Sequence, residues 1–387
     1  MLGKRLRPAR SGAESGMDAM RVLVVGGTGP TGPHVVRGLL ERGHDTTIFH
    51  RGAHEPPELA GVEHIHGDPH FRASIDDALG SRRFDLVIAM YGRLRHLAAA
   101  LAGRCGRVVG ISGVPIYRGY FPGDGCGHLP VPVTEDHPVA DDASAGPAAR
   151  FSLRLAEAEK ALFTHHPEAT VLRFPMLYGP NNARPHEWSV VRRVRDGRRH
   201  MILPDGGLQI HTRCAARNAA AFVLAAIDRP DSAAGQVYNC GDPANWSLRE
   251  WAETIVRLLG ADLEMVAVPG EIAVEAATTL LPLGGTTAAH CVLSTEKARR
   301  ELGYRPAVDP IEALEDVLAW YETQPDFDAA AYPSFTDRFD YETEDALIAE
   351  YRAGVRRAAS AVRQRPAAPV HSMPHPRTPG TVDHRGR

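Results

Sequence analysis

The clearest structural signal in this chain is the nine-residue stretch Val24-Val25-Gly26-Gly27-Thr28-Gly29-Pro30-Thr31-Gly32. It ends a short apolar run, typical of a buried parallel strand, and it precedes a segment (34–43) with apolar residues at helical spacing. Glycines let the backbone approach a pyrophosphate closely, and the positive end of the helix dipole attracts its charge. The stretch therefore predicts a dinucleotide-binding turn. A tight strand-to-helix turn that binds nothing is the alternative.

Strands and helices alternate after this turn. Further strand-like runs lie at 45–52, 84–92, 106–113 and 169–179, and helical stretches such as 151–166 lie between them. This alternation predicts a parallel sheet with right-handed crossovers. After Tyr178 the pattern loosens into short helices and strands, which indicates a smaller α/β domain.

Composition excludes several classes of function. The chain has 387 residues, 43% of them hydrophobic and 24% charged, with a formal net charge of −3, which argues against binding nucleic acid through phosphate neutralisation. No apolar run is long enough to predict a membrane span. The five cysteines are widely spaced, which points to a reducing cytoplasm rather than a disulfide framework. The histidines are scattered along the chain, so no metal site is predicted.

The end of the second strand bears on the choice of dinucleotide. An NAD site usually has an acid there that bonds the ribose 2′-hydroxyl. Here the strand ends in Phe49-His50-Arg51-Gly52, without an acid. Arg51 can pair with a 2′-phosphate and His50 can assist, so the sequence favours NADP(H) over NAD(H). Asp68 is predicted to bond the adenine edge, with a loop cap as the alternative. The predicted cofactor contacts are Gly26, Thr28, Gly29, Thr31, Gly32, His50, Arg51 and Asp68.

From Arg21 to Tyr321 the chain resembles the extended short-chain dehydrogenase/reductase family, the NAD(P)-dependent epimerase/dehydratase group. The landmarks, in the family's order, are VVGGTGPTG, HGD, SGVPIY, AEAEKAL, LRFPMLYGP, ILPDGG, GQVYNCGD and ARRELGYRP. The resemblance implies a Rossmann-type doubly wound parallel sheet and a smaller C-terminal α/β substrate domain, with a cleft between them. It also implies a small-molecule substrate, a contact between Tyr178 and the nicotinamide, and a cytoplasmic homodimer.

The expected organisation has five parts. Residues 1–20 form a disordered leader, and 21–178 form the main part of the NAD(P)-binding domain. Residues 179–340 form mainly the substrate-binding cap, with segments that return to the NAD(P)-binding domain. Residues 341–363 form a C-terminal helix. Residues 364–387 contain five prolines and almost no large apolar side chains, which predicts a disordered tail.

The chain departs from the family's catalytic pattern, which is a Tyr-x-x-x-Lys pair with a serine or threonine. Aligning AEAEK with the family's helix puts Phe151 at the tyrosine position and Leu155 at the lysine position, and Gly113 takes the serine/threonine position. Only three of the 44 basic residues are lysines, and none of them lies four residues after a tyrosine, so no shift of register restores the pair. The family's usual proton transfer is therefore missing.

Other side chains can supply the proton. The candidates are Ser112 and Tyr117 near the end of the strand at 106–113, Tyr91 after the strand at 84–92, and His211 in the segment that usually lines the substrate pocket. For Tyr91 and His211, ordinary packing is the alternative. Substrate contacts are predicted at Trp188, Arg192 and Arg213.

These observations predict an atypical NADP(H)-dependent oxidoreductase that reduces a ketone or related small molecule without the usual Tyr/Lys dyad. One alternative is a redox-neutral isomerase or epimerase that retains a bound NAD(P). Another is a non-enzymatic dinucleotide sensor or scaffold, because an intact glycine turn accompanies a dismantled catalytic trio.

Overall fold

The computed structural model describes residues 19–90, 92–121, 129–142, 146–273, 290–328, 331–332, 335, 337–362 and 378–382. The chain divides into two compact units, residues 1–340 and 341–387. Among the helices in these ranges, none is both long enough and apolar enough to cross a bilayer.

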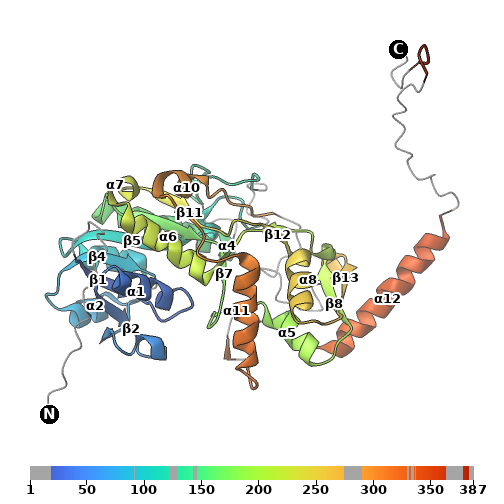
Figure 1. The fold of residues 1–387 in the computed structure, drawn as a ribbon, viewed down its shortest axis with the longest axis horizontal. Helices are drawn as coiled ribbons and strands as arrows, with labels where there is room; N and C mark the ends of the chain where they lie inside the picture. The colour runs from blue at the N-terminus through green and yellow to red at the C-terminus, as the bar shows by residue number, and fades with distance from the viewer. Residues whose placement is uncertain are drawn as a thin grey trace. The chain divides into compact units, whose positions relative to one another are not determined.

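A seven-stranded parallel sheet organises the larger unit, with the strand order β11-β6-β5-β4-β1-β2-β3 (Figure 1). The strands are β1 (Arg21–Val25), β2 (Asp45–His50), β3 (Glu63–His66), β4 (Phe84–Ala89), β5 (Cys105–Gly113), β6 (Thr170–Phe174) and β11 (Val237–Asn239). The order reverses between β1 and β4, and ligands of such sheets bind in the crevice beyond the carboxyl ends of the strands at this point. The predicted Rossmann-type sheet is confirmed.

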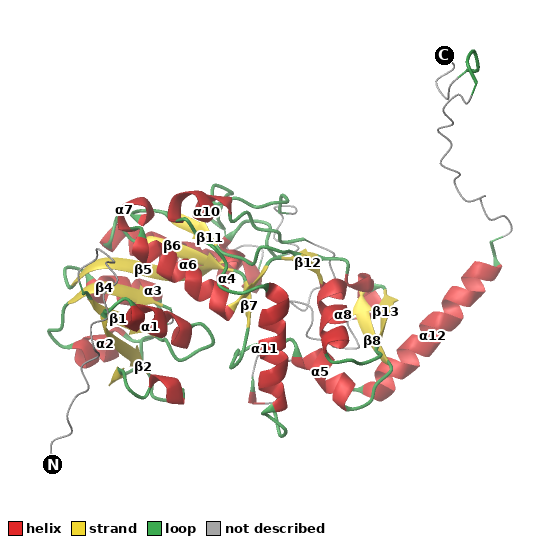
Figure 2. Cartoon of the chain, viewed as in Figure 1, coloured by secondary structure: helices red, strands yellow, loops and turns green. Residues whose placement is uncertain are grey.

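Helices cover both faces of this sheet, as Figure 2 shows. One face packs against α1 (Gly32–Glu41) and α6 (Ala216–Asp228), and the other against α2 (Arg72–Leu79), α3 (Leu94–Leu101) and α4 (Pro147–His165). Side chains alternate along a strand. Val24 therefore packs on the sheet face covered by α1 and α6, while Leu23 and Val25 pack on the face covered by α2 and α3. Burial on both faces explains why β1 is apolar throughout.

A second core, without a large sheet, forms after β6. Its paired strands are β7 (Met176–Tyr178) with β10 (Arg213–Ala215), β8 (His200–Pro204) with β13 (Glu264–Val268), and β9 (Ile210–His211) with β12 (Trp246–Ser247). Helices α5 (Trp188–Arg195), α8 (Leu248–Leu258) and α11 (Pro310–Glu322) pack around it. The helix α8 begins with a capping box between Ser247 and Glu250, which satisfies two backbone donors at its first turn.

The chain crosses between the two cores more than once. Helix α6, α7 (Pro230–Ala233), β11 and α10 (Glu296–Leu302) all follow β7 in sequence but pack in the sheet half. Figure 1 shows α10 beside α6 and β11, although about 70 residues separate the two helices. Several segments within residues 179–340 therefore pack in the sheet half.

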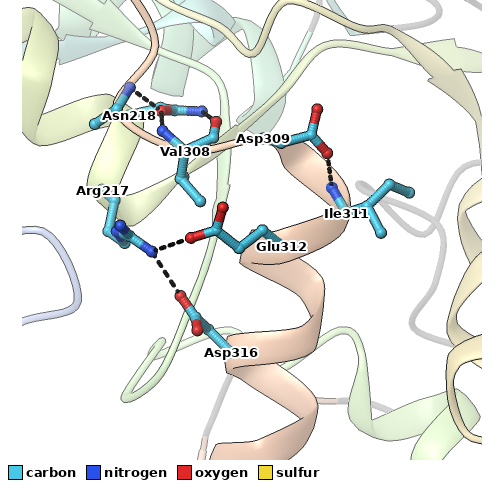
Figure 3. Close-up of polar contacts among 8 residues, drawn as sticks. Arg217, Asn218, Val308, Asp309, Ile311, Glu312 and Asp316 are labelled. Carbon is cyan, nitrogen blue, oxygen red and sulfur yellow. Dashed lines mark hydrogen bonds and ion pairs between the residues drawn. The ribbon is translucent and has the colours of Figure 1, made fainter.

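Helix α6 holds the beginning of α11, as Figure 3 shows. The buried Asn218 side chain donates to the carbonyl of Val308 (3.0 Å) and accepts from the Val308 N–H (3.0 Å). Asp309 then caps α11. Beside it, Arg217 forms ion pairs at 3.0 Å with two carboxylates of α11, those of Glu312 and Asp316. These bonds fix the sheet half to the second core.

The smaller unit contains the helix α12 (Tyr341–Ser360). The predicted leader lies outside the described residues except for Ala19 and Met20. The predicted tail lies outside them except for residues 378–382.

Candidate cofactor and active site

One cavity of about 650 Å³ opens at the carboxyl ends of the central strands, where the strand order reverses. Its wall combines the glycine turn, the end of β2, the residue after β4, one residue of β5, and the end of β6 with the residues that follow it. The described residues that line it are Gly26, Gly27, Thr28, Gly29, Pro30, Thr31, Gly32, His50, Arg51, Ala53, His54, Met90, Ile111, Phe174, Pro175, Leu177, Asn181, Ala183 and Tyr332.

The glycine turn forms one wall of the cavity and requires glycine at defined positions. Gly27 has a φ of 74°, which side chains rarely tolerate. A Cβ atom on Gly32 would lie 2.0 Å from the carbonyl oxygen of Gly27, so any side chain there breaks the turn. A Cβ atom on Gly29 would meet nothing within 4 Å. The backbone at Gly29 is therefore open to a close approach by a ligand.

The beginning of α1 fits an anionic group. Thr31 is the N-cap residue, yet its hydroxyl makes no capping bond, and its Oγ1 is buried without a hydrogen-bond partner. An unsatisfied buried hydroxyl costs about 1–3 kcal/mol, a cost that a bound phosphate oxygen would remove. The helix dipole favours the same occupant. These residues therefore fit the pyrophosphate of a dinucleotide.

The end of β2 forms the next part of the wall. His50 is 3% exposed, and burial, followed by the neighbouring His64 and His66, lowers its pKa. Arg51 is exposed and also lines the cavity. No acidic residue of the described chain lines the cavity here. His50 and Arg51, two of the predicted cofactor contacts, thus both line the cavity.

Asp68 has a different role from the predicted adenine contact. Its carboxylate accepts from the backbone N–H of His70 (2.9 Å) and pairs with the His70 ring (2.8 Å). These contacts, with the backbone bond as the main cause, lower the pKa of Asp68. The residue is not among the described residues that line the cavity. Its carboxylate instead bonds within its own loop, to His70.

The face of α4 that would carry the family's dyad is apolar. Leu155 packs in a cluster with Val114 and Ile116, and a Cβ atom on Gly113 would lie 3.9 Å from Leu155 Cδ1. Phe151 is 42% exposed, and its ring meets the ring of Phe121 edge to face. The positions aligned with the family's lysine and serine/threonine thus lie together. Neither of them offers a group that can transfer a proton.

A buried ion pair stands one turn further along α4. Glu159 accepts two hydrogen bonds from Arg173 of β6, at 2.7 and 3.1 Å, and both side chains are buried. The guanidinium of Arg173 also lies 4.8 Å from the centre of the Tyr117 ring. Tyr117 donates to Asn239 of β11 at 2.6 Å. This network joins α4, β6 and β11.

Tyr117 therefore differs from its predicted catalytic role. It is 1% exposed, and its hydroxyl already donates to Asn239. Burial raises the pKa of Tyr117 to about 12. It is not among the described residues that line the cavity, because η2 (Val114–Ile116) directs the chain into the cluster around Leu155.

The remaining proton-donor candidates also lie elsewhere. Ile111 lines the cavity, so strand alternation turns the next residue, Ser112, toward the opposite face, where it stands in register with Arg173. Tyr91 lies outside the described residues. His211 is buried in β9 and lines a separate cavity of about 10 Å³ together with Tyr178 and Arg213.

Tyr178 does not reach the large cavity either. It is 2% exposed and donates to Asp242 at 2.7 Å. Burial, followed by the charge of Asp242, raises the pKa of Tyr178 far above its ordinary value. The predicted nicotinamide contact is therefore replaced by a hydrogen bond inside the second core.

The three predicted substrate contacts are engaged in contacts within the protein. Trp188 is buried against Tyr321 and Phe327. Arg192 is exposed and pairs with Asp196 at 2.7 Å. The two residues are four apart on α5 and so share one face of the helix, yet Arg192 pairs with Asp196 instead of joining the buried aromatic rings.

Arg213 is buried beneath Trp251, with its Cζ atom 4.5 Å from the centre of a ring. Burial lowers the pKa of Arg213 to about 10, and it raises the pKa of the nearby Glu187 to about 7. Like the other two predicted contacts, Arg213 is not among the described residues that line the large cavity.

Three polar residues of the cavity, His54, Asn181 and Tyr332, were missed by the sequence reasoning. Tyr332 lines it, stacks on Phe327 with ring centres 5.4 Å apart, and has a pKa raised by burial. Tyr332 follows the last family landmark, so no motif pointed to it. Asn181 also lines the cavity and has a φ of 61°. Its position after Gly179-Pro180, a typical turn sequence, was the available signal.

Comparisons with known proteins show which families and enzymes this chain is similar to. The model of the NAD dependent epimerase/dehydratase family matches residues 22–103. The 2-alkyl-3-oxoalkanoate reductase of Stenotrophomonas maltophilia is 27% identical over 337 residues, which cover 78% of this chain and 99% of the relative. The 3-diazoavenalumate denitrifying reductase of a Streptomyces species is 26% identical over 305 residues, which cover 74% of this chain and 96% of the relative.

A solved structure shows the same fold. The dTDP-glucose 4,6-dehydratase of Streptomyces venezuelae, with NAD bound, superposes with a TM-score of 0.59 at 20% identity, covering 79% of this chain and 97% of that chain. The predicted resemblance to the epimerase/dehydratase group is confirmed. The matches support an NAD(P)-dependent enzyme of oxidoreductase or epimerase type.

Proposed function

We propose that this chain is an NADP(H)-dependent oxidoreductase that reduces a ketone or related small molecule without a Tyr/Lys dyad. The observation that carries the proposal is the single cavity that joins the glycine turn to an apolar wall. Such a cavity can hold a dinucleotide at one end and orient a small apolar substrate at the other. The apolar residues of that wall are Met90, Ile111, Phe174, Pro175, Leu177 and Ala183.

The chain's own groups account for cofactor binding. A bound nicotinamide dinucleotide supplies the hydride. The backbone of the glycine turn and the hydroxyl of Thr31 bind the pyrophosphate, since that hydroxyl is buried without another partner. Arg51 pairs with the 2′-phosphate, because the end of β2 offers a cation and no acid.

Tyr332 provides the proton in this proposal. A phenol holds its proton at neutral pH, and burial raises the pKa of Tyr332 further. Its Oη can therefore donate to the carbonyl oxygen of a substrate as the carbonyl carbon receives hydride. The apolar wall beside it excludes water from the reacting atoms.

The substrate class follows from the wall and from the relatives. The apolar wall suits a ketone with alkyl substituents, and one relative is named as a reductase of 2-alkyl-3-oxoalkanoates. We extend the proposal to 3-oxo acids and their decarboxylated ketones as the first compounds to test. A cytoplasmic homodimer that binds neither nucleic acid nor membranes completes the proposal.

The test is NADPH consumption by the full chain over a panel of 3-oxo acids and simple ketones. Tyr332→Phe should lower kcat about 100-fold at an unchanged dissociation constant for NADPH, because it removes a proton donor and keeps the ring. Tyr351→Phe, an exposure-matched change on α12, is the control and should retain full turnover. Absence of NADPH binding, or full turnover of Tyr332→Phe, would refute the respective part of the proposal.

The apolar residues at the dyad positions favour a second candidate, a protein that binds the dinucleotide without consuming it. A redox-neutral isomerase and a dinucleotide sensor both fit this description. Saturable NADPH binding without oxidation across the whole panel would favour this candidate over the reductase.

A further inference from the structure

Four potential metal ligands meet at the edge of the sheet, although they are spread over 17 residues of sequence. His50 is the last residue of β2, and His64 and His66 lie two apart on β3. In the parallel ladder, His50 is in register with His66 and Ile48 with His64. Side chains two residues apart share a face of a strand, so the three imidazoles lie together. Glu55 reaches them from the loop after β2.

The distances within this histidine cluster (His50, Glu55, His64 and His66) are short. Nε2 of His50 lies 2.7 Å from Nδ1 of His64, and Nε2 of His66 lies 2.7 Å from Oε1 of Glu55. The gap between the two pairs, from His50 Nε2 to Glu55 Oε1, is 3.6 Å. One ligand atom from each residue can be chosen so that all four lie within 4.8 Å of one another.

These spacings resemble those of a four-coordinate metal site. Zinc bonds of about 2.0–2.1 Å in a tetrahedron place neighbouring ligand atoms about 3.3 Å apart. The two short contacts need to open by about 0.6 Å, and the longest must close by about 1.5 Å, to reach that value. Three imidazoles and one carboxylate form a donor set that suits zinc and related divalent transition metals rather than magnesium or calcium.

A backbone carbonyl orients the His64 ring for this role. Its Nε2 lies 3.1 Å from the carbonyl oxygen of Leu59. A carbonyl only accepts, so the ring proton sits on Nε2, and the lone pair of Nδ1 points into the cluster. Metal-binding histidines characteristically donate their other N–H to a carbonyl or carboxylate in this way.

His50 requires one rearrangement. The N–H of Gly52 donates to its Nδ1 at 3.2 Å, so without a metal the proton sits on Nε2 and bridges to His64. A metal ion would replace that proton, which moves to Nδ1 without net gain or loss. The Gly52 peptide then turns its N–H away. Gly52 has a φ of 74°, in a region where glycine moves freely.

The geometry points to a binding site for one divalent transition-metal ion of the zinc type. Its ligands are His50, His64, His66 and one carboxylate oxygen of Glu55. The ion would fasten the loop at 51–55 to the end of β3. Since His50, Arg51, Ala53 and His54 also line the large cavity, the bound ion would hold the part of the wall nearest the end of β2.

The direct test uses the full chain, free of any affinity tag and stripped with a chelator. Titration with Co²⁺ should saturate at one equivalent, with the intense visible absorption of four-coordinate cobalt, and Zn²⁺ should displace it. His66→Ala and His64→Ala should each weaken Co²⁺ binding at least about 10-fold, since each removes a ligand. His54→Ala is the matched control, because it removes an exposed histidine next to Glu55 and should bind as the unchanged chain does.

The deciding variant is His66→Ala, whose position is exposed and tolerates truncation, so a folding failure of the more buried His64→Ala does not block the test. Absence of a saturable four-coordinate spectrum overturns the proposal. Equal Co²⁺ affinity of His66→Ala and His54→Ala overturns it as well, because the histidines would then form only a hydrogen-bonded cluster.

A second readout rests on the proposed function. One equivalent of Zn²⁺ should tighten NADPH binding about threefold, through a nearby positive charge and a fixed loop. The Co²⁺ titration involves no cofactor. A failure of NADPH binding therefore disproves the proposed function and leaves the metal site to be judged from its own spectrum.

Discussion

The glycine turn and the face of α4 that carries Phe151 and Leu155 offer different chemistry, because the turn leaves its backbone open to a ligand whereas this face of α4 is apolar. In the turn, a Cβ atom on Gly32 would lie 2.0 Å from the Gly27 carbonyl oxygen, and Thr31, whose hydroxyl is buried without a hydrogen-bond partner, lines the cavity. On α4, Phe151 and Leu155 occupy the dyad positions. The demands of binding a dinucleotide are met, while the demands of the family's proton transfer are not.

The polar residues around α4 hold the fold together instead. Glu159, Arg173 and Tyr117 form a buried network, with every contact made inside the protein. A buried charge without its partner is strongly destabilising, whereas an apolar pair of similar size is tolerated. The residues around the turn therefore suit ligand binding, whereas the polar residues around α4 contribute to stability.

The largest effect is expected from Arg173→Met. It leaves the Glu159 carboxylate buried without a partner and should lower the free energy of unfolding by about 3–5 kcal/mol. Denaturant unfolding measures this loss. The double variant Arg173→Met/Glu159→Leu should recover most of it. If the double variant is as unstable as the single one, the pair is not what holds α4 to β6.

Gly32→Ala should have the next largest effect. The added methyl group displaces the Gly27 carbonyl, which should lower stability by about 3 kcal/mol and abolish measurable NADPH binding. Gly29→Ala is the matched control for stability, because its methyl group meets no protein atom within 4 Å. Thermal unfolding and fluorescence titration with NADPH check both changes. Wild-type stability of Gly32→Ala would contradict the geometry of the turn.

Arg51→Ala tests the cofactor preference and should change only ligand binding. We expect a loss of about 10-fold in NADPH affinity with little change for NADH, because one charged hydrogen-bonding partner of a 2′-phosphate is removed. Arg37→Ala, at an exposed position on α1, is the control. Equal losses of affinity for NADPH and NADH would show that Arg51 does not bind the 2′-phosphate.

The smallest effect is expected at the far end of β1, where Arg21 pairs with Asp85 at 3.0 Å on the surface. The side-chain hydrogen bond from Arg21 is the main cause that lowers the pKa of Asp85 below 3.8. The carboxylate therefore contributes stability above about pH 4, and this contribution is lost as the pH falls through the lowered pKa.

Asp85→Asn should consequently lower the melting temperature by no more than about 2 °C at pH 7 and should have a smaller effect near pH 3, where part of the contribution is already lost. Melting curves of both chains across this pH range make the comparison. A larger loss at pH 3 than at pH 7 would reverse the sign and reject the assignment.

The sheet and the turn could be predicted from the sequence because both depend on local patterns. Alternating apolar runs specify the parallel strands, and glycines between a strand and a helix specify the turn. The register of α4 was also accessible, since Gly113 and Leu155 do lie together. These features could be predicted because residues close together in the sequence determine them.

The side chains around the cavity could not be predicted in the same way. Tyr117 and Tyr178 have the chemistry of proton donors, but partners more than 60 residues away hold their hydroxyls. Tyr332 reaches the cavity from beyond the last motif. The histidine cluster depends on the register between β2 and β3. Each of these depends on contacts between segments that are remote in sequence.

The repeated crossing of the chain between its two cores has a consequence for how this fold can be divided. The sheet half takes β11, α6, α7 and α10 from segments that follow β7, so no single cut separates the halves. A fragment of residues 21–178 would lack an edge strand of the sheet and the α6 cover of one face. The dinucleotide-binding half is therefore not a module that can be transplanted as one contiguous piece, and grafting it requires at least two segments of chain.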